Sequence, residues 1–379
     1  MIDRRGVIGG GLAMSALPLA GARAAGREPV MNHIIMEDGR VWIAATIYNK
    51  PYLFVVDTGA FASMIDDSFA KSLHLRQIRG PQIIGIGGVA NRSWYNAGEV
   101  KLASGISFPN MAFAGIAKRP SPDSVGTLGA GLFTTYDSDL DFTKGEWRAY
   151  PDGRPNFDGL TRIKSHFTRN PGGASIIAEG TVGGFIGDFL LDTGSPGGMS
   201  LNGRATRRSG LWDDSKPYAP TQSYGIGPGA VPGRIIRAPR VRIGTYAFEN
   251  QLVRLDEPGS PTLGQDGLIG LNLLGQLHLT TDVSSESLYI APNDARVPPI
   301  AYAFSGLRLD LDKGKVVIAD VGTGSPAAAA GLKKGDRLVG EPRAVALALA
   351  GPPGRQVRAT VDSDGGKTRD VEFVLRAYL

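Results

Sequence analysis

The chain has 379 residues, of which 42% are apolar and 20% charged, enough to build the cores of two or three domains. It contains no cysteine and only four histidines, which excludes disulfide frameworks and thiolate metal sites, so we expect no metal and no cofactor. The formal charge of +5 is scattered along the chain, so we expect no nucleic-acid partner.

Residues 1–24 have the features of an export signal. Arg4 and Arg5 precede an apolar run over residues 7–20, and Ala22-Arg23-Ala24 fits a small-x-small cleavage pattern. This run is shorter than the roughly 20 residues that a membrane-spanning helix needs. The paired arginines suggest the twin-arginine route, and the general secretory route is the alternative. We therefore expect export to a bacterial periplasm, without a stable membrane span in the mature chain.

The next segment is expected to be rich in β-strands, because 53 glycines and 25 prolines favour short strands and turns. Two strands pair around a turn, and the second strand ends at an Asp-Thr-Gly triplet. Asp66 is placed to cap the short helix that follows. This first copy comprises strands over 42–47 and 53–56 around Asn49-Lys50-Pro51, the triplet Asp57-Thr58-Gly59, a helix over 67–74, a hairpin from Gly85-Ile86-Gly87, a strand over 100–102 and a Leu128-Gly129 turn.

The same order of features recurs later in the chain. From the short strand before the apolar-Gly turn onward, the two copies keep a constant offset of six residues, which chance would not produce. One Asp-Thr-Gly would be explained by a turn; two in matched contexts predict a duplication whose internal two-fold axis places Asp57 opposite Asp192. The second copy comprises strands over 174–181 and 185–191 around Gly183-Gly184, the triplet Asp192-Thr193-Gly194, a helix over 203–209 capped by Asn202, Gly225-Ile226-Gly227, a strand over 241–243 and an Ile269-Gly270 turn.

These motifs resemble those of retropepsin-like aspartic proteases with both lobes in one chain, over roughly residues 30–292. The first signature is Asp57-Thr58-Gly59-Ala60 with a hydroxyl residue, Ser63, three positions later. The second, Asp192-Thr193-Gly194-Ser195, is closer to the pepsin style. The resemblance implies hydrolysis of a polypeptide by a water molecule activated between the two aspartates, which share one proton. It also implies that the apolar-Gly turns pass beside the catalytic loops.

The resemblance assigns roles to further residues. Supporting the catalytic loops are Thr58, Gly59, Thr193, Gly194 and Ser195, with the threonines bonding across the lobes and the glycines donating N–H groups. Contacting substrate, largely from two flap regions, are Ala60, Ser63, Gly85, Ile86, Gly87, Trp94, Tyr95, Gly225, Ile226 and Gly227. Packing at the base of a hairpin is the alternative for Trp94 and Tyr95. The Ser195 hydroxyl could donate to Asp192, which would leave the proton on Asp57.

The C-terminal segment from about residue 303 resembles a bacterial PDZ domain. Its best match is Gly324-Ser325-Pro326-Ala327, where Ser325 can cap a helix that begins at Pro326, followed by a turn over 330–336. By resemblance, Gly306, Leu307, Arg308 and Leu309 would capture the C-terminus of a peptide that adds a strand. Arg308 occupies a usually small site, and the stretch over 336–357 is short for the family. The alternative is a domain that only docks on the protease.

The expected fold is mainly β, with two pseudo-two-fold-related acid-protease lobes and a small α+β PDZ-like domain. We expect an exported aspartic endopeptidase that acts as a monomer, because the duplication supplies both lobes. One alternative is a catalytically silent peptide-binding or scaffold protein, and another is an exported β-rich protein whose repeat is only structural. The predicted segments are a signal (1–24), lobe 1 (25–150), a linker (151–170), lobe 2 (171–292), a linker (293–302) and the PDZ-like domain (303–379).

Overall fold

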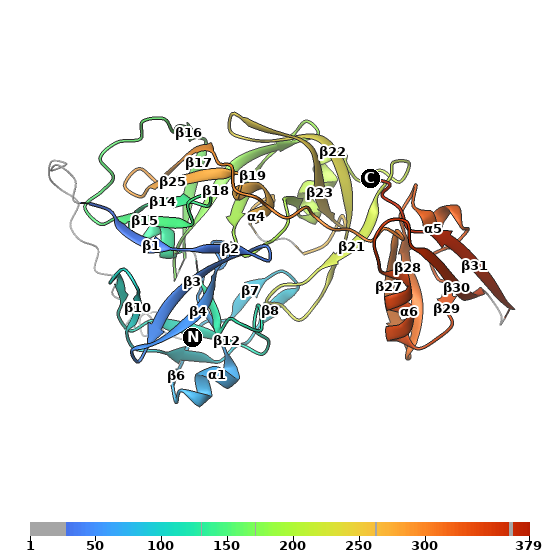
Figure 1. Cartoon of the computed structure of the whole chain (residues 1–379), viewed down its shortest axis with the longest axis horizontal. Helices are drawn as coiled ribbons and strands as arrows, with labels where there is room; N and C mark the ends of the chain where they lie inside the picture. Colours follow the sequence, from blue (N-terminus) through green and yellow to red (C-terminus); the bar gives the residue numbers. More distant parts are fainter. Residues whose placement is uncertain (1–27, 130, 171, 262–263, 364–366) are drawn as a thin grey trace, which may run out of the picture.

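The computed structural model describes residues 28–379 except 130, 171, 262–263 and 364–366. The predicted export signal lies outside these residues. The described chain is mainly β, as expected, with two lobes that share a sheet and a separate body formed by the C-terminal residues (Figure 1). Among the helices that the structure describes, none is long and apolar enough to cross a membrane.

The first lobe is built on a ten-stranded sheet in which the predicted hairpin joins β3 to β4. Ile47 pairs with Lys50, so the turn consists of Tyr48 and Asn49, both with positive φ, as a two-residue hairpin turn favours. Its elements are β2 (Ile35–Glu37), β3 (Arg40–Ile47), β4 (Lys50–Val56), β5 (Met64–Asp66), α1 (Asp67–Ser72), β6 (Arg76–Ile78), β9 (Trp94–Asn96), β10 (Val100–Leu102), β11 (Ser107–Phe108), β12 (Ala112–Ile116), β13 (Gly126–Leu128) and α2 (Gly131–Thr134), with a separate hairpin of β7 (Ile83–Gly85) and β8 (Gly88–Ala90).

The second lobe repeats this plan on an eight-stranded sheet, with β18 and β19 joined by Gly183-Gly184 as predicted. Strand β17 falls inside the predicted linker but pairs with β18, so the lobe begins before residue 171. Its elements are β17 (Ser165–Asn170), β18 (Gly173–Val182), β19 (Phe185–Asp192), β20 (Met199–Leu201), α3 (Gly203–Ser209), β21 (Ala219–Ser223), β22 (Val231–Ile243), β23 (Tyr246–Asp256), β24 (Gly267–Gly270) and α4 (Leu271–Leu274).

Both predicted helix caps are confirmed. The carboxylate of Asp66 accepts the N–H of Phe69 at the start of α1, and the side chain of Asn202 accepts the N–H of Ala205 at the start of α3. Helix α1 ends at Ser72, two residues earlier than expected. The two caps place equivalent short helices after the two Asp-Thr-Gly triplets.

A six-stranded sheet joins the lobes, and its central pair, β14 and β25, brings one strand from each copy. Buried Asp139 on β14 is bound by Arg154, by Thr280 on β25 and by His278; burial raises the pKa of Asp139, but these partners outweigh it and hold the pKa below its usual range. One continuous apolar core runs through both lobes. The strands of this sheet are β1 (Val30–His33), β14 (Asp137–Asp141), β15 (Glu146–Tyr150), β16 (Thr161–Ile163), β25 (Leu277–Asp282) and β26 (Ser287–Pro292).

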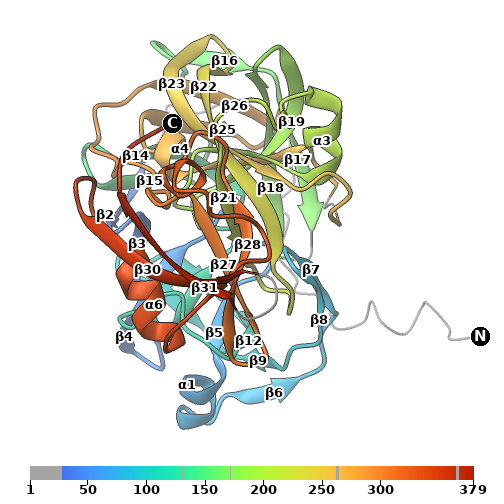
Figure 2. The same ribbon diagram turned by 90° about the vertical axis from the view of Figure 1, so that its right-hand side faces the viewer.

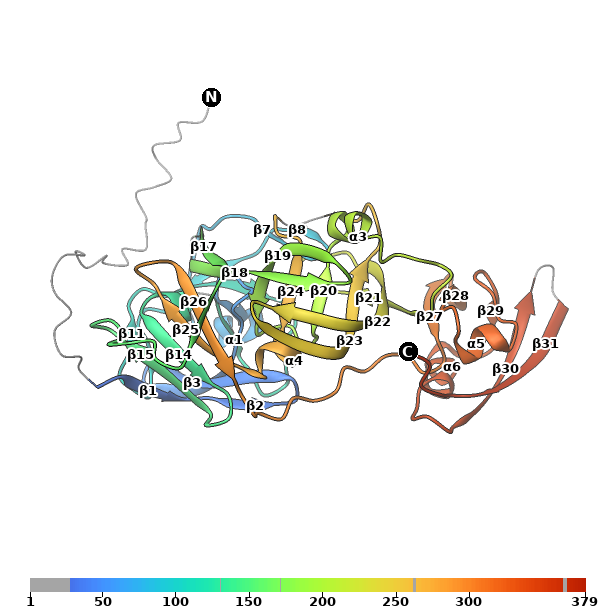
Figure 3. The same ribbon diagram turned by 90° about the horizontal axis from the view of Figure 1, so that it is seen from above.

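The C-terminal body has its own five-stranded sheet and its own apolar core (Figure 3). Ser325 caps α5 through the N–H of Ala328, with Pro326 as the first helical residue, as predicted. Strand β27 lies at one edge of the sheet, and β31 at the other. Its elements are β27 (Leu307–Asp312), β28 (Lys315–Val321), α5 (Pro326–Ala329), β29 (Arg337–Leu338), α6 (Pro342–Leu349), β30 (Gln356–Ser363) and β31 (Lys367–Val374).

Candidate active site

The two Asp-Thr-Gly triplets meet at the boundary between the lobes. Asp57 follows β4 and Asp192 ends β19, and their side chains are in hydrogen-bond contact with each other. Each aspartate stands where its strand lies parallel to the strand of the apolar-Gly turn, β13 in the first lobe and β24 in the second. The duplication therefore places two carboxyl groups at one point on the pseudo-two-fold axis.

Glycine is required beside each carboxyl group. A Cβ added to Gly59 would lie 2.5 Å from Cγ of Asp192, and one added to Gly194 would lie 2.4 Å from Cγ of Asp57. The backbone N–H groups also match across the axis, with Gly59 and Ala60 donating to Asp57 and Gly194 and Ser195 donating to Asp192. These donors stabilise negative charge on either carboxylate.

Thr58 and Thr193 form a reciprocal, buried hydrogen-bond network across the axis. Each hydroxyl oxygen accepts the backbone N–H of the other threonine, at 3.1 and 3.0 Å. Each hydroxyl also donates to a strand of the opposite lobe, Thr58 to the carbonyl of Leu191 at 2.7 Å and Thr193 to that of Val56 at 2.8 Å. The four bonds fix the two triplets relative to each other.

The apolar-Gly turns lie beside the catalytic loops, as the resemblance implied. Asp57 N–H donates to the carbonyl of Leu128, and Gly129 N–H donates to the hydroxyl of Ser63. In the second lobe, Gly270 N–H donates to the carbonyl of Gly198. The Ser63 hydroxyl thus holds the turn, and its expected contact with substrate stays a prediction. Ala60 is buried, and its N–H donates to Asp57.

Burial raises the pKa of both carboxyl groups, and it raises that of Asp192 well above the usual value, helped by the neighbouring charge of Asp57. At Asp57 the N–H donors, the Asp192 side chain and the Arg40 charge oppose the effect of burial on the pKa. Ser195 reaches Asp192 with its backbone N–H, which Ala60 matches on the other side, so the contact creates no difference between the carboxylates.

The two Gly-Ile-Gly motifs meet each other at the tips of two loops, which occupy the regions expected to be flaps. The first flap is β7, β8 and the turn between them, and the second flap is the loop over residues 224–230 between β21 and β22. Gly227 N–H donates to the carbonyl of Ile86, and Gly229 N–H to that of Gly87, both at 3.0 Å. A Cβ on Gly85 would lie 2.2 Å from Cγ2 of Ile226. The absence of side chains at these glycines allows the tips to interlock.

Trp94 and Tyr95 are core residues, so their expected role in gripping substrate is wrong. They are 7% and 3% exposed, on β9 between β6 and β12. Trp94 Nε1 donates to the carbonyl of Pro81, and the Tyr95 hydroxyl donates to Asp67 on α1. Trp94 packs with Ile83 of the first flap, whereas Tyr95 belongs to the main core of the lobes.

The residues expected to capture a peptide carboxylate lie at the start of β27, where their loop is closely packed. Gly306 N–H donates to the carbonyl of Ala303, and Leu307 N–H donates to the hydroxyl of Ser305. A Cβ on Gly306 would lie 2.0 Å from that of Ser325. Two of the N–H groups expected to bind a carboxylate are thus already bonded within the chain, and peptide capture stays a prediction. Arg308 pairs with Asp310, and Leu309 continues the strand.

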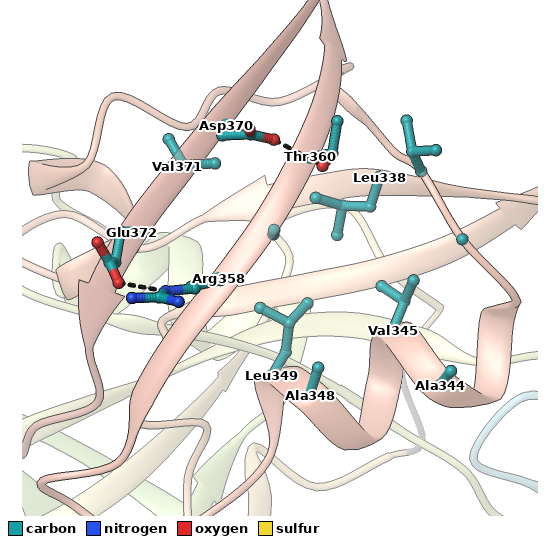
Figure 4. A pocket seen from close by; sticks show the side chains of 13 residues that line it. Leu338, Ala344, Val345, Ala348, Leu349, Arg358, Thr360, Asp370, Val371 and Glu372 are labelled. Atoms are coloured by element: carbon teal, nitrogen blue, oxygen red, sulfur yellow. Dashed lines mark hydrogen bonds and ion pairs between the residues drawn. The ribbon is translucent and has the colours of Figure 1, made fainter.

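An open hollow of about 670 Å³ lies elsewhere in the C-terminal body, between α6 and the strands β29, β30 and β31 (Figure 4). Val345 and Leu349 of α6 face it, and the ion pair of Arg358 with Glu372 borders it. The residues Gly306 to Leu309 are not among those that line it. This hollow and the expected carboxylate loop are therefore different places on the domain.

A comparison with protein families finds a match within the first lobe. A family model described as aspartyl protease matches residues 43–132. The matched segment holds Asp57 and the turn at Gly129. Among curated proteins, none matches this chain.

Three solved structures resemble the chain at low sequence identity. The crystal structure of basic 7S globulin from soybean is 10% identical with a TM-score of 0.40, covering 72% of this chain and 100% of that one. The structure of edgp is 12% identical with a TM-score of 0.42, covering 71% and 96%. Conglutin gamma from lupine seeds is 10% identical with a TM-score of 0.41, covering 70% and 95%. Likeness at this level bears on neither activity nor substrate.

Two arginines at the site were missed from the sequence. Arg40 donates to the carbonyl of Gly194 at 3.1 Å, and Arg92 donates to the carbonyl of Ile226 at 2.6 Å, so each reaches from the first lobe to the second. Arg40 lies opposite Asp57 in the observed register, in which Trp42 pairs with Val55, but the turn expected from the sequence did not give this register. No sequence pattern pointed to Arg92.

Proposed function

We propose that the chain is an exported aspartic endopeptidase. The observation that carries the proposal is the contact between the carboxyl groups of Asp57 and Asp192, in which burial and mutual repulsion favour a single shared proton. One carboxylate and one carboxylic acid at the same point supply a general base and a general acid together. The aspartyl protease family match over residues 43–132 supports the assignment.

The reaction follows from this pair. The ionised carboxylate removes a proton from a water molecule as the water oxygen bonds to the scissile carbonyl carbon, and the protonated carboxyl donates to the carbonyl oxygen. Collapse of the tetrahedral intermediate breaks the C–N bond, and the proton taken from water passes to the leaving amine. The carbonyl oxygen returns its proton, so the pair ends as it began.

The two flaps support a polypeptide as the class of substrate. The first flap and the second flap meet through the backbone bonds of Gly227 and Gly229, so a substrate must either pass beneath the tips or separate them. An extended polypeptide suits such a passage, because it can bind as a strand with alternate side chains facing opposite walls. We propose that the flaps open to admit a peptide and close over it.

Export and recruitment complete the proposal. Arg4, Arg5 and the apolar run after them support secretion, and the internal duplication supports a monomeric active unit. The C-terminal body is proposed to be PDZ-like, since it has the predicted capped helix α5 and an unpaired edge at β27, to which a peptide could add a strand.

Incubation of the purified protein with a mixed peptide library between pH 3 and 8 tests the proposal, with products identified by mass spectrometry. We expect internal peptide bonds to be cleaved in the acidic part of this range, and cleavage to stop when a peptide with a secondary hydroxyl in place of the scissile carbonyl is added, because that group mimics the tetrahedral intermediate. Binding of this peptide without any cleavage of the library would favour the scaffold function instead.

A further inference from the structure

The two halves of the site differ in one charge. Continuing the β3–β4 register places Arg40 opposite Asp57, and continuing the β18–β19 register, in which Ile177 pairs with Leu190, places Ser175 opposite Asp192. Ser175 is buried and its hydroxyl accepts the side-chain N–H of Asn170. A permanent cation therefore stands at a position where the second copy has a neutral hydroxyl.

Arg40 is held in place by the second catalytic loop. Its guanidinium donates to the carbonyl of Gly194 at 3.1 Å, and the preceding Gly39 packs so tightly on Pro196 that an added Cβ would lie 3.0 Å from the Cβ of Pro196. The charged groups that face Asp57 are Asp192 on the second loop and Arg40 on β3. Glu37, opposite Arg40 on β2, is exposed, so water screens its charge.

We propose that Arg40 is a positioning residue that places the negative charge of the pair on Asp57 and the shared proton on Asp192. The N–H donors to the two carboxylates are matched, so the cation is the difference that the geometry provides. Asp57 is then the base that takes the proton from water, and Asp192 is the acid that donates to the carbonyl oxygen. This assignment rests on the proposed function, but the location of the proton can be measured without turnover.

Carbon-13 NMR of the full chain labelled at the aspartate side-chain carboxyl carbon tests it, with the two resonances assigned from the Asp57→Asn and Asp192→Asn variants. In the wild type we expect the Asp57 carboxyl to titrate at lower pH than that of Asp192. Arg40→Gln should raise the titration of Asp57 by about one pH unit, since a cation nearby favours the charged form. Arg40→Lys, which keeps the charge, should stay close to the wild type.

Arg237→Gln is the matched control, because Arg237 also donates to a backbone carbonyl, that of Asn250, but on an exposed part of β22. The acidic limb of the kcat/KM profile should move with the titration of Asp57 in Arg40→Gln and not in the control. A wild type in which Asp192 titrates first, or an Arg40→Gln chain with an unchanged titration, overturns the proposal. If no peptide is cleaved, the NMR titration still decides it.

A second inference comes from the contact between the C-terminal body and the base of the second flap. Tyr218, directly before β21, is buried there, and its hydroxyl lies 3.1 Å from both Asp320 and the carbonyl of Val321 on β28. Its own carbonyl accepts the hydroxyl of Tyr378 at 3.2 Å. Figure 2 views the molecule from this end, where β21 lies beside β27 and β28.

The contact extends to both strands that flank the second flap, β21 and β22. The guanidinium of Arg234 on β22 lies between the rings of Trp212 and Tyr218, at 3.9 and 3.8 Å from their centroids. The hydroxyl of Thr323 donates to the carbonyl of Asp214, in the loop that carries Trp212. Tyr218 thus connects the C-terminal body, through β21 and β22, to the flap tip that bonds Ile86.

We infer that the contact of the C-terminal body with Tyr218 holds the second flap against the first. Breaking this contact should weaken the hydrogen bonds between the two flap tips. A Cβ on Gly322 would lie 2.0 Å from the carbonyl oxygen of Tyr218, and Gly322 has no positive φ. Gly322→Val should therefore disrupt this contact while leaving the C-terminal sheet able to form. Gly264→Val is the control, since a Cβ there meets nothing within 4 Å.

Hydrogen–deuterium exchange of the full chain measures this without turnover. In Gly322→Val we expect the amides of Gly227 and Gly229 to exchange several-fold faster than in the wild type, together with that of Tyr218, which donates to the carbonyl of Thr323. In Gly264→Val all three should keep the wild-type rates. Faster exchange at Tyr218 with unchanged exchange at Gly227 and Gly229 contradicts the inference, as does unchanged exchange at all three.

Discussion

Replacing either Asp57 or Asp192 with asparagine is expected to lower kcat/KM by at least about 10³-fold, since each change removes either the general base or the general acid. The double variant should lose little more than each single one, because both carboxyl groups act in the same step. Initial rates on a peptide found in the library, measured at the optimal pH of the wild type, check this. Asp123→Asn, at an exposed position, is the control and should retain full activity.

The loss of activity in these two variants should not come from unfolding of the chain. Burial raises the pKa of Asp192 in the folded chain, so its ionisation destabilises the fold as the pH rises from about 4 toward that raised value. A neutral asparagine avoids this cost, and we expect Asp192→Asn to melt at the same temperature as the wild type or higher at neutral pH. Full activity in either Asp variant would remove the basis of the proposed function.

Thr58→Val and Thr193→Val are each expected to lower the free energy of unfolding by about 2–5 kcal/mol, since valine has nearly the same shape but leaves two buried groups without partners. For Thr58 these are the N–H of Thr193 and the carbonyl of Leu191. The two substitutions share one network, so their effects should not add. Kcat/KM should also fall, because the triplets lose their fixed relative position.

Urea unfolding followed by tryptophan fluorescence measures this effect in the lobes alone, because the four tryptophans, at positions 42, 94, 147 and 212, all precede the C-terminal body. Thr46→Val is the matched control, since its hydroxyl also donates to a backbone carbonyl, that of Lys101, but at an exposed position. It should cost less than about 1 kcal/mol. A cost for Thr58→Val no greater than for Thr46→Val would show that the network is not important for stability.

The pairing of Asp57 with Asp192 could be predicted because the duplication leaves a signal along the whole copy. The matched spacing of motifs in the two copies indicates a two-fold axis between them. The apolar strand before each triplet indicates that each aspartate lies at the end of a buried strand. Local rules also sufficed where a side chain accepts a backbone N–H three residues later in the chain, as at the caps Asp66, Asn202 and Ser325.

The predictions that failed depend on contacts between segments distant in sequence. Trp94 and Tyr95 are adjacent on β9, and strand periodicity does not show that both lie in the core, between strands that come before and after them. The bond of Ser63 to Gly129, which was also not expected from the sequence, spans 66 residues. Strand β17 was assigned to a linker because it forms a strand by pairing with β18, and its own sequence does not show that pairing.

The two residues that give the halves of the site different charge are present in the sequence, but the sequence does not show that they occupy equivalent positions. The third residues after the aspartates, Ala60 and Ser195, drew attention because they are close in sequence. The position that differs in charge, Arg40 against Ser175, becomes apparent only when the hairpin registers are known. Electrostatic asymmetry at a duplicated site is therefore better sought across the strands than along the loops.

The central claim is that the two carboxyl groups hold one proton between them, and titration of the carbon-13-labelled carboxyl groups of the wild-type chain tests it most directly. The account predicts two coupled transitions, with one proton retained well above the pH at which ordinary aspartates ionise, and removal of this coupling in either Asp57→Asn or Asp192→Asn. Two independent transitions, each near pH 4, the ordinary value for aspartate, would contradict it.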